Sequence, residues 1–152
     1  MTESGTRSGR WRKATRATFL GWIAGFVVTS PVQIIEVLRN SGSSAPLLLS
    51  ALGYGFAVWL LITLAGSIAV WLGLISPIAL FVSPQWLLRH RAAVIATAVC
   101  LGLLVVSYLV HVWTHFYHDG VGLMSFWIYA CFVVAFSGVT AYSYLRFLSR
   151  DA

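Results

Sequence analysis

The chain has 152 residues, of which 59% are hydrophobic and only 9% are charged, and its formal net charge is +6. Soluble domains carry about 25% charged residues, so this composition excludes an ordinary soluble domain and indicates an integral membrane protein. The basic residues stand in short clusters between apolar runs, which is typical of membrane-topology signals and argues against a nucleic-acid partner. We therefore predict an all-α, integral membrane four-helix bundle.

The first sixteen residues are polar, small and basic, without apolar periodicity. They predict a disordered cytoplasmic tail over 1–16, followed by a four-helix transmembrane domain over 17–148. A basic segment before an apolar run can also begin a signal peptide. The apolar run here continues past signal-peptide length, which favours an uncleaved first span. The tail carries a basic cluster next to the membrane, formed by Arg7, Arg10, Arg12, Lys13 and Arg16.

The first span is expected over 17–38, where Pro31 should kink the helix. Glu36 and Arg39 close this span and lie three residues apart, on one helix face. They are predicted to form an ion pair at the membrane interface. The loop over 40–46 has the composition of a turn.

The middle of the chain contains a long stretch without charged residues that ends at Arg89. It is long enough to suggest two spans, but two spans would place Arg89 opposite the basic tail, against the positive-inside bias. We therefore predict one long helix over 47–74. A re-entrant or interfacial segment over 75–88 follows, which Pro77 and Pro84 are expected to break.

The third and fourth spans are expected over 92–113 and 121–145. With both termini cytoplasmic, only one of the ten basic residues, Arg39, lies on the outer side. This asymmetry predicts a multi-pass protein of the bacterial inner membrane with its N- and C-termini inside.

Small residues at helical spacing indicate how the helices pack. Lipid supplies no hydrophobic attraction between helices, so close approach of the backbones has to hold them together. We expect helix–helix contacts at five positions, and a leucine at either of the last two glycines should lower stability. These positions are Gly21 and Gly25 in the first span, and Gly66, Ala69 and Gly73 in the second.

One segment near the outer end of the third span concentrates metal-ligating residues, namely His111, His115, His118 and Asp119. On a helix the three histidines fall within about 60° of one another, so they could bind a metal with the aspartate as fourth ligand. The alternative is an interfacial belt of amphipathic side chains. A haem site lacks a second histidine at matching depth, because His90 is about 31 Å away along the helix.

No pattern for catalysis is visible, since the sequence shows no nucleophile with a base and no carboxylate pair. Proton-coupled exporters need a carboxylate deep in the membrane, whereas Glu36 is near the outer end of its span. We predict a non-catalytic accessory or anchor subunit, or a small immunity-type interaction protein, that binds other membrane subunits or itself through helix faces. Alternatives are a small transporter or channel, or a haem- or metal-binding redox anchor. We expect no cofactor unless the histidine cluster binds a metal or haem.

Overall fold

The computed structural model describes residues 7–40, 45–117 and 123–150, and these are helical almost throughout, with no strand among them. Four helical stretches are long and apolar enough to cross a membrane. The predicted all-α architecture with four candidate spans is therefore confirmed. In chain order the elements are α1 (Arg7–Asn40), α2 (Ala45–Val70), the π-helical turn η2 (Trp71–Ile75), α3 (Ser76–Phe81), α4 (Pro84–Arg89), α5 (Arg91–Tyr117) and α6 (Leu123–Ser149).

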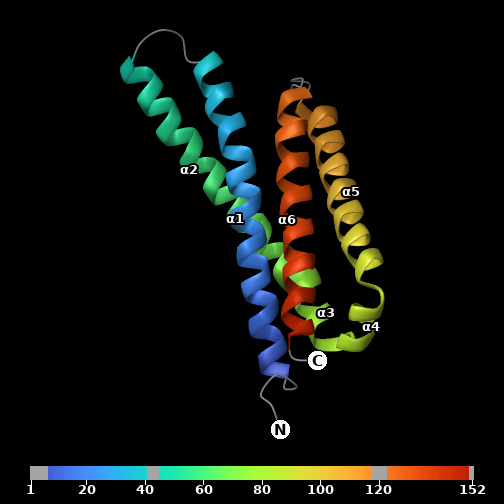
Figure 1. The fold of residues 1–152 in the computed structure, drawn as a ribbon. Helices are drawn as coiled ribbons and strands as arrows, with labels where there is room; N and C mark the ends of the chain where they lie inside the picture. Colours follow the sequence, from blue (N-terminus) through green and yellow to red (C-terminus); the bar gives the residue numbers. More distant parts are fainter. Residues whose placement is uncertain (1–6, 41–44, 118–122, 151–152) are drawn as a thin grey trace.

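Helices α1 and α6 form the central pair of the fold and lie side by side along most of their length (Figure 1). Helix α2 packs on α1, and α5 packs on α6. Helix α2 crosses the central pair obliquely, so that α3 and α4 reach the base of α5 while the start of α2 lies far from α5 (Figure 1). We call the end of the bundle at which α1 begins and α6 ends the basic end, and the opposite end the far end.

The first helix begins earlier than expected. Residues 7–16 are helical, so the prediction of a disordered tail over 1–16 is wrong for this part, while residues 1–6 lie outside the described residues. Ala14 and Ala17 are fully buried in a cluster with Tyr144 and Leu145 of α6. The helix is extended because this packing at the basic end stabilises turns that are polar in sequence.

The second spanning helix continues through Pro77, which was expected to break it. The N–H of Ser76 bonds to the carbonyl of Trp71, five residues earlier, and this bond widens the helix into a π turn. A proline lacks the N–H for the usual bond and its ring clashes with the carbonyl four residues earlier, here that of Gly73. The π turn includes Gly73, where this clash would occur. The helix then continues to Phe81.

The chain does break before Pro84. Ser83 has extended backbone angles, as expected for a residue that precedes proline. Its side chain accepts a hydrogen bond from the N–H of Trp86 at 3.4 Å, and Pro84 occupies the first turn of α4. The re-entrant or interfacial placement of 75–88 stays a prediction.

Candidate functional site

Most of the histidine cluster lies outside the described residues. The side chain of His111 is exposed on α5, whereas the side chain of His115 and the whole of His118 and Asp119 lie outside the described residues. Among the residues that are described, no group of three or more His, Cys, Asp or Glu side chains could hold a metal ion. The proposed metal ligation therefore stays a prediction.

The ion pair expected at the end of the first span also lies outside the described side chains. Glu36 and Arg39 lie within α1, but their side chains are outside the described part of the structure. Their pairing stays a prediction as well.

Glycines of α1 and α5 lie where helices approach most closely. A Cβ atom added at Gly21 would lie 2.6 Å from the backbone oxygen of Phe136, and one at Gly25 would lie 2.8 Å from the ring of Phe132. Both neighbours belong to α6. Gly102 of α5, which was not predicted from the sequence, lies equally close to α6. A Cβ atom added there would collide with the side chain of Val133 and lie 2.9 Å from the Oγ of Ser137.

The small residues of the second span do not form the expected contact. Gly66, Ala69 and Gly73 are exposed, and a Cβ atom added at either glycine would meet nothing within 4 Å. No helix of the described part of the chain makes the predicted contact at the two glycines, because α2 buries a different face. That face contains Trp59 and Thr63, which are both 4% exposed.

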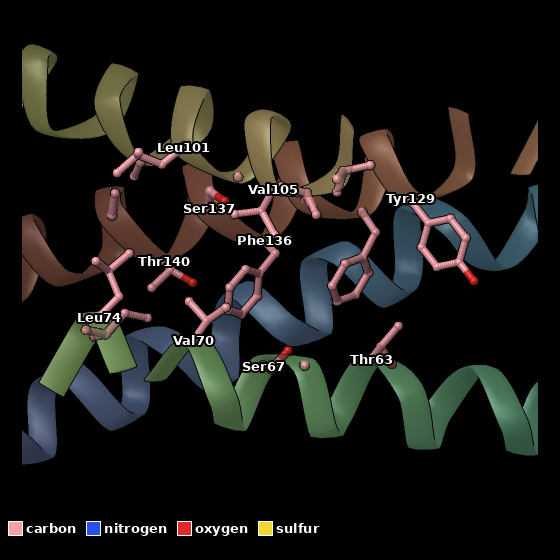
Figure 2. A pocket seen from close by; sticks show the side chains of 18 of the residues that line it. Thr63, Ser67, Val70, Leu74, Leu101, Val105, Tyr129, Phe136, Ser137 and Thr140 are labelled. Atoms are coloured by element: carbon pink, nitrogen blue, oxygen red, sulfur yellow. The ribbon is translucent and has the colours of Figure 1, made fainter. Parts of the chain in front are cut away.

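A cavity of about 350 Å³ lies between α2 and α5, with α6 as its floor. In the described part of the chain the backbones of α2 and α5 do not approach closely. The backbones of α2 and α5 lie farther apart toward the far end (Figure 1), and we call the cavity between them the wedge. Ile75 and Ile78 line the opposite end, from η2 and α3. Figure 2 shows much of the lining, including Thr63, Ser67 and Val70 from α2, Leu101 and Val105 from α5, and Phe136 from α6.

The lining of the wedge is almost wholly apolar and contains no Asp, Glu, Lys, Arg or His. Its polar groups are a few hydroxyls, and two of these belong to the buried residues Ser67 and Thr140. Neither hydroxyl has a hydrogen-bond partner. Such a site has the groups needed to bind an apolar molecule.

The wedge was not predicted from the sequence. The available signal was the occurrence of hydroxyl residues at mid-span in both the second and the fourth span, at Ser67 and Thr140. That signal is weak, because serine and threonine also bond to their own helix, as Thr29 does to the carbonyl of Gly25 at 2.8 Å. Only the helix arrangement brings the two segments to one cavity.

Comparison with protein families, with curated proteins and with solved structures gives no match for this chain. Two properties of the molecule itself bear on its function. One is the wedge between α2 and α5, and the other is the distribution of basic residues along the bundle.

Proposed function

We propose that this chain is a non-catalytic accessory protein of the bacterial inner membrane that binds an apolar partner from within the bilayer. The observation that carries the proposal is the uncharged wedge of about 350 Å³ between two candidate spans whose backbones do not approach closely among the described residues. Ligand pockets in proteins have volumes of about 300–1,000 Å³ and mostly apolar linings. The size and lining of the wedge fall within this class.

The shape of the wedge supports selective binding. Within lipid, association depends on van der Waals packing and hydrogen bonds, because the surrounding chains are as apolar as the protein. A cavity walled by three helices offers more contacts to a molecule of matching shape than a single helix face does. Small residues on its walls, such as Gly66 and Ala98, let a partner approach the helix backbones closely.

The charge distribution supports an orientation for the protein. All basic residues except Arg39, nine of the ten in the chain, belong to the first turns of α1, to α4, to the start of α5, to the end of α6 or, for Arg150, to the position directly after α6. These parts lie together at the basic end (Figure 1). By the positive-inside rule this end faces the cytoplasm, and both termini are then cytoplasmic.

The proposed orientation can be tested with reporters fused to the C-terminus. We expect an alkaline phosphatase fusion, which is active only in the periplasm, to be inactive, and a green fluorescent protein fusion to fluoresce. Activity and fluorescence are compared at equal expression levels. An active phosphatase with a dark fluorescent protein would place the C-terminus outside and contradict the proposed topology.

Binding at the wedge can be tested by photo-crosslinking in native membranes. We expect benzoylphenylalanine at Val70 or Leu101, which line the wedge, to form an adduct of defined mass. Matched positions on the same helices, Leu61 and Leu104, are 63% and 65% exposed and lie outside the lining. They should give only the diffuse labelling expected of bulk lipid. If mass spectrometry finds the same products from both pairs of positions, the wedge is not a binding site.

A further inference from the structure

The length of the wedge limits what can occupy it. Along α6 its lining extends from Tyr129 to Tyr144, a distance of about 22 Å at the rise of an α-helix. A membrane-spanning helix needs about 30 Å. The lining also includes Ile75 and Ile78, so η2 and α3 wall the wedge toward the basic end. A partner helix would meet this wall, whereas a flexible hydrocarbon chain can lie in a wedge that is closed at one end.

The absence of charged side chains from the lining limits the charge of the occupant. A charged group taken from the membrane surface into this site would lose its hydration and find no partner of opposite charge. The part of the ligand that enters the wedge is therefore neutral.

One hydroxyl in the wedge has an unused hydrogen-bond donor. Ser67 is 5% exposed, its Oγ has no partner, and it lies near the middle of the candidate span Leu52–Phe81. Thr63, one turn earlier on the same face, is satisfied because it donates to the carbonyl of Trp59 at 2.9 Å. Figure 2 shows Ser67 directed from α2 toward the floor of the cavity, where Phe136 lies.

The second unpartnered hydroxyl has a different environment. The Oγ1 atom of Thr140 lies against Gly21, where an added Cβ atom would collide with it. This oxygen belongs to the contact between α1 and α6, so Ser67 is the hydroxyl that can serve a ligand.

We infer that the wedge binds a neutral lipid with a carbonyl oxygen on its hydrocarbon chain, and that Ser67 donates a hydrogen bond to this oxygen. A carbonyl satisfies the serine donor without bringing a donor of its own that would need a further acceptor in the membrane. A lipid alcohol would bring such a donor. This inference rests on the proposed function, because it names the class of molecule that the wedge takes from the bilayer.

The test uses two probes that differ only in the carbonyl group, methyl pentadecyl ketone and heptadecane. Each is titrated into the full-length protein in detergent, and the rise in the thermal unfolding temperature reports binding. We expect the ketone to bind about fivefold more tightly than the alkane, the effect of one net hydrogen bond. Ser67→Ala should make the two affinities equal. Ser107→Ala, at an exposed serine of α5 outside the lining, should leave the difference unchanged.

A second pair of variants tests the location of the site. Gly66 lines the wedge and has open space beside it, so Gly66→Leu fills the cavity without a clash in the fold. We expect this variant to unfold like the parent and to lose stabilisation by both probes. Gly73→Leu also enters open space but lies outside the lining, and it should bind both probes normally.

Three results would count against the inference. Equal affinity of the parent for both probes would overturn the role of Ser67 and the carbonyl. Normal binding by Gly66→Leu would overturn the location. If neither probe binds, and crosslinking from Val70 and Leu101 captures a protein helix, the lipid is the wrong class of occupant but the proposed function stands. Absence of any wedge-specific adduct would instead contradict the proposed function.

Discussion

Replacing Gly21 by leucine is expected to destabilise the folded protein by about 3 kcal/mol, at the upper end of the range for overpacked positions. The contact of α1 with α6 is the most extensive in the fold. A Cβ atom at Gly21 would collide with the side chain of Thr140 and lie 2.6 Å from the backbone oxygen of Phe136. Backbone cannot move aside as a side chain can, so the two helices must separate. Thermal or denaturant unfolding of the detergent-solubilised protein measures the loss.

Gly73→Leu is the matched control for this prediction. It makes the same change of residue in another membrane-spanning helix, at a position where nothing lies within 4 Å. We expect its unfolding temperature to stay close to that of the parent. Equal losses in the two variants would mean that the cost comes from the leucine itself and not from the contact between α1 and α6.

Replacing Arg10 by leucine is expected to destabilise the connection between α3 and α4 by about 2 kcal/mol, within the range for hydrogen bonds to charged groups. The half-buried guanidinium donates to the carbonyl of Leu80 at 2.7 Å and to that of Val82 at 3.4 Å. These carbonyls lie at the C-terminal end of α3, where a helix lacks internal donors and a positive charge is favourable. Without Arg10 both carbonyls lose this partner.

Hydrogen exchange measures the effect of Arg10→Leu locally. Backbone amides of α3 and α4 should exchange faster, while those in the middle of α6 should change little. Arg12→Leu is the control, since Arg12 is exposed on the same helix. If both variants accelerate exchange equally, the effect comes from loss of positive charge at the basic end and not from the two hydrogen bonds of Arg10.

The sequence by itself determined the membrane class, the four candidate spans and the asymmetry of basic residues. These properties depend on the free energy of transferring each segment from water to lipid. A sum of residue contributions over a short window of sequence is enough to estimate this free energy. The single long second span is an example. The charge at Arg89 argued against two crossings, and the structure has one helical stretch from Leu52 to Phe81.

Only the tertiary structure decided which small residues make contacts. Gly21 and Gly66 have similar sequence surroundings, yet one lies against α6 and the other borders an open cavity. The difference depends on how α2 is rotated about its own axis. The face that it buries contains Trp59 and Thr63, whereas Gly66 is exposed. Local spacing cannot predict this rotation, because it is set by partners distant in sequence, such as Trp22, which donates to Thr63 at 3.2 Å.

The same reason applies to the start of α1 and to the wedge. Residues 7–16 look disordered in sequence but are helical because Ala14 and Ala17 are buried at the basic end among residues of α6. The wedge exists because α2 crosses the central pair obliquely, so that among the described residues its backbone does not approach that of α5 closely (Figure 1). Helix positions follow from local hydropathy, whereas crossing angles follow from side-chain packing between helices, which no single segment of the sequence contains.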